Sequence, residues 1–336
     1  MQQISAIWVG NPFFYAGLAD LGWHIVWINP PTGTVLTWDE IVAEAGFTPD
    51  VLIVADKSLP PFVVGMETFP CVTVFYAVDT HIHSWFPLYA QGFDIVLVSL
   101  RDHLSFFLGA RHTTETLWWS PPFAKNEDIP KGPAPEKPLW DVLFVGKIDP
   151  AVNEERHIFF TKLAPLVPGL HITSGSYCDL YPQAKIVLNH AIQNDLNFRV
   201  FEALGCGACL VTPIVGHGLV ELFRDEQDLF LYDQQDIPGL AALLVSLLAA
   251  PEKCREVGKN GHAAILAGQY MHHRANTFAA KIEHMLASGQ ASKIIQTRIH
   301  SAKDILASWL RLIYLLHAET TVAPEAKNRY LQAARG

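Results

Sequence analysis

The chain has 336 residues, of which 50% are hydrophobic and 17% are charged, and its formal net charge is −9. This length suits two domains, because a single hydrophobic core rarely grows so large. The acidic balance argues against a protein that coats nucleic acid, whose affinity would come from lysines and arginines on phosphates. A small anionic ligand is still compatible, since it needs only one or two cations and some backbone amides.

Signals for export and membrane insertion are not evident in the sequence. The first 17 residues lack the basic and apolar regions of a secretory signal. The nearest candidate for a membrane span, residues 305–318, is shorter than the roughly 20 residues required and contains Arg311. Five scattered cysteines favour a reducing compartment over a disulfide framework. We therefore expect a cytoplasmic protein without a transmembrane segment, whose amphipathic tail packs on another domain or contacts a membrane surface.

Short apolar segments alternate with helical patterns, which is typical of α/β units with a parallel sheet. In the first half, the sequence predicts strands at residues 4–10, 23–29, 51–56, 71–78 and 94–99. Each is nearly all apolar, as expected for strands covered on both faces. Gly10 and Asn11 follow the first strand, in a loop expected to face a cleft between domains. Their surroundings lack the complete Gly-x-Gly-x-x-Gly spacing, so we do not expect bound NAD.

The loop after the strand at 71–78 contains Asp79, His81 and His83. Loops in this position face the cleft of a two-domain protein, and histidine titrates near neutral pH. These three residues are therefore candidates for the catalytic base or for contacts with an acceptor. Two alternatives are hydrogen bonding within the loop and a metal site, because Asp-x-His-x-His is similar to a ligand set.

Prolines concentrated between residues 121 and 138 predict an extended linker. They are Pro121, Pro122, Pro130, Pro133, Pro135 and Pro138. Beyond them the sequence predicts strands at 141–146, 170–175, 185–190, 208–213 and 229–233. Helices are predicted at 153–167, 197–207, 218–225, 237–250, 251–269 and 302–319. The predicted organisation is an N-terminal domain at 1–122, a linker at 123–138, a second domain at 139–290 and a helical tail at 291–336.

Two turns of the second domain have features of a phosphate site. Gly146 and Lys147 follow the first strand, where glycine permits close approach of a ligand and Lys147 or Arg156 can bind a phosphate. The other turn precedes a helix, whose free amides and dipole favour an anion. It consists of Gly216, His217, Gly218 and Leu219. Taken alone, each turn is equally typical of an ordinary strand-to-helix connection.

The helix predicted at 197–207 contains Glu202 among apolar residues, although burial of an unpaired carboxylate is costly. Arg199 lies three residues earlier, on the same helical face. A surface ion pair between them is one explanation. The other is that Glu202 accepts hydrogen bonds from a ribose diol while Arg199 lies near a phosphate. Asn194, Asp195 or Asn197 can cap this helix.

Over roughly residues 140–285 the order of these elements resembles the C-terminal domain of GT-B glycosyltransferases. The helix sequence RVFEALGCG, at residues 199–207, is most similar to that of the CgeB-type spore-maturation group. The resemblance implies two Rossmann-like domains facing across a cleft, and transfer of a sugar from a nucleoside diphosphate to an unidentified acceptor, without a metal or cofactor. It also implies that Glu202 binds the ribose, Lys147 contacts the diphosphate, and the amides of residues 216–218 hold phosphate.

One departure from the family pattern concerns stereochemistry. Many retaining members carry a second glutamate eight positions before the ribose-binding one, where this chain has Asn194. We therefore expect a hexosyltransferase, and both retention and inversion of the anomeric configuration are compatible with the sequence. The alternatives are a non-catalytic protein that binds nucleotide or carbohydrate, and a nucleotide-sugar epimerase. Cys206 and Cys209 lack a second pair for zinc, and the adjacent His272 and His273 cannot face one ligand from a helix.

Overall fold

A computed structural model describes residues 3–109, 111–132 and 137–336. The chain forms two compact units, both of the α/β class. Unit 1 consists of Met1–Pro121 and Arg274–Gly336, and unit 2 of Pro122–His273. Unit 2 therefore begins and ends earlier than the predicted second domain at 139–290.

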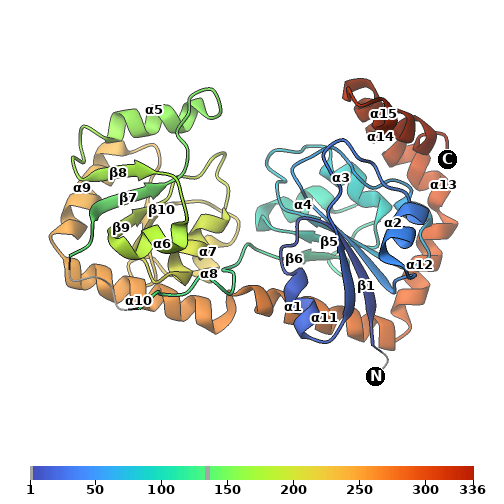
Figure 1. Ribbon diagram of the computed structural model, residues 1–336, viewed down its shortest axis with the longest axis horizontal. Coiled ribbons are helices and arrows are strands. Elements are labelled where there is room, and N and C mark those ends of the chain that lie inside the picture. Colours follow the sequence, from blue (N-terminus) through green and yellow to red (C-terminus); the bar gives the residue numbers. More distant parts are fainter. Residues whose placement is uncertain (1–2, 110, 133–136) are drawn as a thin grey trace. The chain divides into compact units, whose positions relative to one another are not determined.

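Unit 1 is built on a six-stranded parallel sheet in the order β2-β1-β3-β4-β5-β6 (Figure 1). Its strands are β1 (Ser5–Gly10), β2 (His24–Ile28), β3 (Val51–Ala55), β4 (Val72–Ala77), β5 (Ile95–Val98) and β6 (Leu117–Trp119). All five predicted strands are present, and the three-residue β6 is additional. Gly10 ends β1 where an added Cβ would lie 2.0 Å from Ala55 O, so glycine is required there for β1 to pack on β3.

The last helices of the chain belong to the core of unit 1. The short helices of this unit are α1 (Tyr15–Asp20), α2 (Trp38–Ala45), α3 (Phe86–Tyr89) and α4 (Leu104–Phe107). The later ones are α11 (Met271–Ala287), α12 (Gln290–His300), α13 (Ala302–Ile305), α14 (Arg311–Thr320) and α15 (Pro324–Ala333). A π-helical segment at Leu306–Leu310 joins α13 to α14, where the sequence predicted one helix. Leu310, Tyr314 and Tyr330 share one hydrophobic core with Val54 and Phe75 of the sheet.

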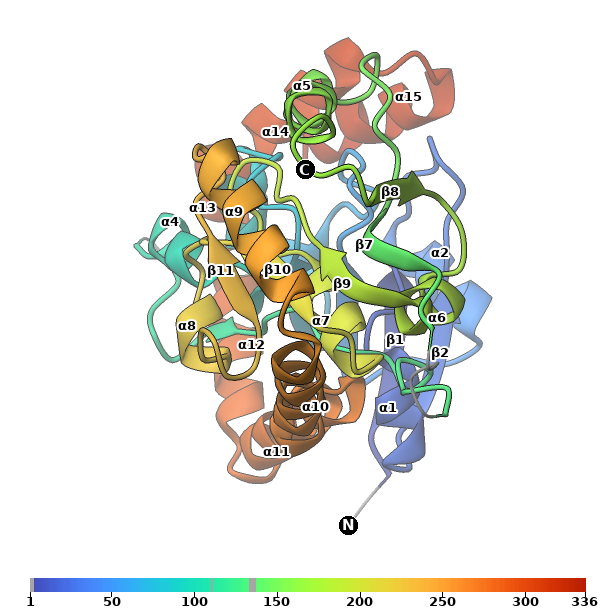
Figure 2. The same cartoon turned by 90° about the vertical axis from the view of Figure 1, so that its left-hand side faces the viewer.

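Unit 2 is built on a five-stranded parallel sheet in the order β11-β10-β9-β7-β8 (Figure 2). Its strands are β7 (Trp140–Val145), β8 (Leu170–Thr173), β9 (Ala184–Leu188), β10 (Leu210–Pro213) and β11 (Phe230–Tyr232), all five predicted. Its helices are α5 (Glu154–Leu163), α6 (Tyr177–Leu180), α7 (Phe198–Gly205), α8 (Leu219–Leu222), α9 (Ile237–Leu248) and α10 (Pro251–Gly268). Among the described helices, α9 and α10 reach the length and apolarity of a membrane span only as a pair, which is bent by 101°.

Residues 123–128, predicted as part of an extended linker, instead pack within unit 2. Phe123 and Asp128 are buried, and Ala124 forms a β-bridge with Tyr270. Phe123 also meets Phe198 edge to face, with ring centroids 5.3 Å apart. The apolar side chains between the prolines are therefore part of the core. Pro133 and Pro135 lie outside the described residues.

A buried ion pair joins the sheet of unit 1 to α12. Arg298 Nε donates to Asp94 Oδ1 at 2.9 Å, and both side chains are fully buried. The other guanidinium nitrogens donate to the carbonyls of Met66, Phe69 and Cys71. Four hydrogen bonds and one ion pair thus meet at the Arg298 guanidinium, so removal of Arg298 takes this partner from one carboxylate oxygen and three carbonyls.

We predict that Arg298→Ala lowers the free energy of unfolding of unit 1 by about 3–5 kcal/mol, the typical effect of breaking a buried pair. The partly exposed pair between Arg329 and Glu40 provides the control, and Arg329→Ala should cost about 1 kcal/mol or less. Denaturant titration followed by tryptophan fluorescence reports on unit 1, because Trp140 is the one tryptophan outside it. Equal losses in the two variants would contradict this prediction.

Candidate functional site

The carboxyl ends of β7, β9 and β10 meet at one edge of the sheet of unit 2. The chain passes from β7 to β8 on one side and then crosses to β9 on the other side of β7, so the strand order reverses at β7. Open α/β sheets bind ligands at such a point. Gly146 and Lys147 follow β7 at this edge, and Asn189 and His190 follow β9. The sequence singled out the first two of these residues and missed the second two.

A buried amide, Asn189, holds Arg199 in place. Arg199 Nη1 donates to Asn189 Oδ1 at 3.0 Å. Asn189 Nδ2 in turn donates to Thr212 Oγ1 at 3.0 Å and to Asn197 Oδ1 at 3.3 Å. Asn197 occupies the N-cap position of α7, but its side chain makes no capping hydrogen bond. The Asn189 amide therefore fixes the first turn of α7 against β10, and the exposed Asn194 precedes this turn with a φ of 58°.

Two guanidinium groups share one aromatic ring at this edge. Arg199 Cζ lies 5.2 Å and Arg156 Cζ 5.6 Å from the ring centroid of Phe144. Arg156 Nη1 also donates to Lys147 O at 3.3 Å, whereas its buried Nε has no hydrogen-bond partner among the residues described. Burial and the charge of Arg199 lower the pKa of Arg156 to about 10. Within the described residues, neither arginine forms an ion pair with a carboxylate.

His190 lies next to these arginines and is fully buried. Its ring packs against Phe159 at 4.5 Å between centroids, and neither ring nitrogen has a hydrogen-bond partner in the described part of the chain. Burial, together with the charges of Arg156 and Arg199, lowers the pKa of His190 to about 4. The imidazole is therefore neutral at neutral pH. A buried polar ring without a partner, beside two cations, indicates a site that an additional polar group completes.

The loop after β7 approaches Arg199 closely. A Cβ added at Gly146 would lie 3.0 Å from the Phe144 ring and 3.5 Å from Arg199 Nη2. Lys147, the predicted contact for a diphosphate, has an exposed side chain, and Arg156 binds its carbonyl. The partly buried cations at this edge are thus Arg156 and Arg199.

The turn at residues 216–219 connects β10 to α8. His217 and Gly218 both adopt left-handed backbone conformations, with φ of 59° and 88°. The helix that follows has only four residues, Leu219–Leu222, in place of the predicted 218–225. So short a helix has a weak dipole, and any contribution to anion binding would come from the turn amides.

Glu202 lies one turn along α7 from Arg199, but the two do not form an ion pair among the described residues. The pKa of Glu202 is raised to about 7, because burial and the carboxylate of Asp128 outweigh the opposing charges of Arg199 and Lys125. Tyr177 donates from its hydroxyl to Asp128 Oδ1 at 2.9 Å, between the two acids. The carboxyl group of Glu202 is therefore poised between its two protonation states near neutral pH.

Gly205 brings the two acids together. A Cβ at this position would lie 2.8 Å from Asp128 O and 3.1 Å from the Cβ of Ala124. Glycine thus lets residues 124–128 pack directly on α7, which puts the carboxylate of Asp128 near that of Glu202. This contact between distant parts of the chain could not be inferred from the sequence around Glu202 alone.

In unit 1, the predicted residues Asp79 and His83 meet at Ser58, which the sequence did not single out. Ser58 Oγ donates to Asp79 Oδ2 at 2.5 Å and lies 3.3 Å from His83 Nε2. Asp56 accepts hydrogen bonds from the backbone of Ser58 and Asp79, and burial raises its pKa to about 6. Burial lowers the pKa of His81. Asp79, His81 and His83 do not form a metal-binding group within the described residues.

Comparison with known proteins identifies the fold. Residues 141–280 match a family model described as glycosyl transferase-like, and no curated protein matches the chain. A glycosyltransferase from Rickettsia africae ESF-5 has a TM-score of 0.61 at 9% identity, over 85% of this chain and 99% of that one. Anabaena Alr3699/HepE, solved with UDP-glucose, has a TM-score of 0.61 at 12% identity, over 84% and 100%. Sucrose-phosphate synthase from Thermosynechococcus elongatus has a TM-score of 0.58 at 13% identity, over 85% and 100%.

These similarities confirm the predicted fold. The chain has the GT-B architecture of two Rossmann-like α/β units with a helical C-terminal region. At such low identities the similarity of the structures establishes the fold and leaves the chemistry to be argued from the residues.

We predict that Glu202→Gln stabilises the protein increasingly between pH 4.5 and 7 and by up to about 3 kcal/mol above this range. The folded state binds the proton of Glu202 more tightly than the unfolded state, so native stability falls as pH rises through this window. Glutamine does not ionise, so the stability of Glu202→Gln does not fall for this reason as pH rises. Scanning calorimetry at pH 4 and 8 measures the effect, and the exposed Glu127→Gln serves as control. A pH-independent difference between native protein and Glu202→Gln would disprove the assignment.

Proposed function

We propose that the protein is a glycosyltransferase that binds a nucleoside diphosphate sugar at the carboxyl edge of the unit 2 sheet. The observation that carries this proposal is the arginine pair on the Phe144 ring. Among the residues that the structure describes, Arg156 and Arg199 present two positive charges without a carboxylate partner, beside His190, whose ring nitrogens have no hydrogen-bond partner there. A diphosphate supplies the two negative charges and the hydrogen-bond acceptors for this site. The match to a glycosyl transferase-like family model over residues 141–280 supports the same function.

The proposed roles follow the order of the charges along α7. Arg199, in its first turn, and Arg156 hold the diphosphate and stabilise the charge that develops when the bond to the anomeric carbon breaks. Glu202, one turn later, accepts hydrogen bonds from the ribose hydroxyls when it is ionised. Gly146 permits the ligand to approach the backbone, and the amides of residues 216–219 supply further donors. Binding of this kind positions the anomeric carbon for attack.

The transfer itself forms a bond from an acceptor hydroxyl oxygen to the anomeric carbon and releases the nucleoside diphosphate. The acceptor proton must go to a base, which we propose is Asp79, His81 or His83. Arginines and backbone amides neutralise the leaving group, so the proposal requires no metal. The finer assignments, to hexose donors and to the CgeB-type group, are part of this proposal and rest on the helix sequence at 199–207.

Incubation with UDP-, GDP- and ADP-linked hexoses tests the function. Transfer to an acceptor, or slow hydrolysis of the donor, supports a glycosyltransferase. Inversion at C2 of the donor sugar would instead identify an epimerase. Binding without turnover over a broad acceptor panel would favour a non-catalytic protein, the alternative to which Asn194 gives weight because it replaces the second glutamate.

We predict that Arg199→Gln and Glu202→Ala each weaken UDP binding by about 1–3 kcal/mol, the usual effect of losing hydrogen bonds to a charged group. Isothermal titration with uridine separates the two roles, because uridine has a ribose but no phosphate. Glu202→Ala should weaken uridine binding, and Arg199→Gln should leave it unchanged. Unchanged UDP affinity in a folded Glu202→Ala variant would remove Glu202 from the ribose site. The same titrations with GDP and ADP identify the preferred nucleobase of the donor.

We predict that His81→Ala leaves nucleotide binding intact and reduces kcat, because His81 lies on unit 1 beside the Ser58 cluster. His24, an exposed histidine in β2 of the same unit, supplies the control. His24→Ala should leave nucleotide binding and kcat unchanged. Steady-state kinetics measure kcat, with the donor that the nucleotide-sugar incubations identify. Native turnover in His81→Ala would exclude His81 from the reaction and leave Asp79 and His83 as candidates.

A further inference from the structure

A second group of reactive side chains lies in unit 2. The ligand atoms of Asp128, Cys178 and Cys206 all lie within 4.8 Å of one another. Cys178 Sγ is 3.4 Å from Asp128 Oδ1. All cysteines of the chain are free thiols, and within the described residues this is the one group of three side chains with metal-binding geometry.

Three separate segments build this group. Asp128 comes from the segment that packs on α7, Cys178 lies in α6, and Cys206 is the C-cap residue of α7. The carboxylate of Asp128 is already oriented, because Lys125 N donates to its Oδ2 at 2.7 Å and Tyr177 donates to its Oδ1. Hydrogen bonds of this kind, which orient a ligand from outside the coordination sphere, accompany most protein metal sites.

We propose that Asp128, Cys178 and Cys206 bind a thiophilic divalent cation of the zinc class. Cysteine sulfur and aspartate oxygen are standard zinc ligands. Their bond lengths in a tetrahedral site place two sulfurs about 3.8 Å apart and a sulfur and an oxygen about 3.6 Å apart. The observed distance from Cys178 Sγ to Asp128 Oδ1 is 3.4 Å, and no separation among the three ligand atoms exceeds 4.8 Å, so small side-chain rotations would form the site. Each thiol loses its proton to solvent on coordination, and no oxidation or reduction takes place.

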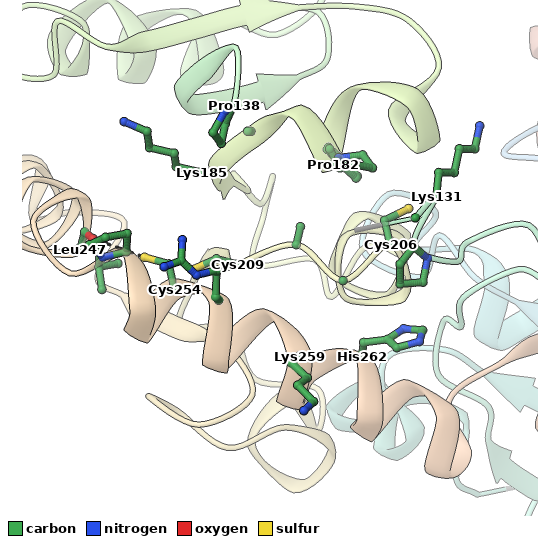
Figure 3. A pocket seen from close by; sticks show the side chains of 18 of the residues that line it. Lys131, Pro138, Pro182, Lys185, Cys206, Cys209, Leu247, Cys254, Lys259 and His262 are labelled. Atoms are coloured by element: carbon green, nitrogen blue, oxygen red, sulfur yellow. Dashed lines mark hydrogen bonds between the residues drawn. The ribbon is translucent and has the colours of Figure 1, made fainter. Parts of the chain in front are cut away.

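A cavity of about 920 Å³ borders the proposed site and would give its fourth coordination position access to solvent. Cys206 is one of the residues that line this cavity, and Figure 3 shows it beside Lys131 at the end opposite Leu247. Asp128 and Cys206 are buried and Cys178 is half-buried, so the cavity provides the entry path that a metal requires. Water from the cavity can complete a tetrahedral site.

The Cys-x-x-Cys pattern of the sequence joins Cys206 to Cys209, whereas the structure groups Cys206 with Cys178. Cys209 directly precedes β10 and lines the same cavity as Cys254. Cys254 Sγ donates to Leu247 O at 3.3 Å, and no carboxylate completes a group of three with this pair among the described residues. Cys209 and Cys254 are therefore matched controls, because they are buried thiols of the same unit at the same cavity.

Cobalt(II) titration of the full chain, reduced and stripped with a chelator, tests the proposal. We expect one equivalent to bind, with the absorption band of thiolate coordinated to cobalt, and zinc to displace it. Cys178→Ser and Cys206→Ser should each weaken cobalt binding at least tenfold and reduce that band. Cys209→Ser and Cys254→Ser should retain both. This proposal does not depend on sugar transfer, so the nucleotide experiments and the metal titration can fail separately.

Two results would overturn the metal site. One is cobalt binding to Cys178→Ser and Cys206→Ser with native affinity and a native spectrum. The other is a Cys178–Cys206 disulfide in the protein as purified, with no metal uptake after reduction. Circular dichroism establishes whether each variant is folded, and the half-buried Cys178 provides a test even if Cys206→Ser is unstable.

Discussion

The edge of unit 2 is organised around two guanidinium groups that repel each other. Arg156 and Arg199 both lie against Phe144 and have no carboxylate partner among the described residues. Partly buried like charges are costly, so the fold must hold them by other means. Asn189 fixes Arg199 from β9, and the carbonyl of Lys147 fixes Arg156 from the loop after β7. The carboxyl ends of neighbouring strands thus maintain a positive site that an anion would relieve.

Two acids of unit 2, Glu202 in α7 and Asp128 in the segment that packs on α7, lie close to each other. Glu202 follows Arg199 by one helical turn and lies near a second acid, Asp128, where burial raises the pKa of Glu202 to about 7. A change from cationic to acidic side chains along α7 matches a nucleotide, whose phosphates are negative and whose ribose offers hydroxyl donors. Among the described residues Arg199 and Glu202 form no ion pair with each other, because the Arg199 guanidinium is bound to Asn189, which follows β9.

The sequence predicted what depends on local pattern and missed what depends on contacts between distant residues. Ten strands could be located because each is a short apolar run, whereas the three residues of β6 are too few for such a pattern. Asn189 and His190 looked like the polar end of a strand, and only the three-dimensional structure shows what they touch. The residues alone left Lys147 and Arg156 as equal candidates for a phosphate contact, and only the structure shows that Arg156 is the partly buried one of the two. Ser58 carried no motif and is identified by its contact with Asp79.

The end of α7 shows how several constraints act on consecutive residues. Gly205 has to be glycine because residues 124–128 pack on it, and Gly207 adopts a φ of 75°, which ends the helix. Cys206 stands between them and faces Asp128 and Cys178. Because Glu202 lies one turn earlier on the same helix, movement of residues 124–128 changes both the electrostatic environment of Glu202 and the geometry of the thiols. The proposed ribose contact and the proposed metal site are thus coupled through a single close approach of backbone to helix.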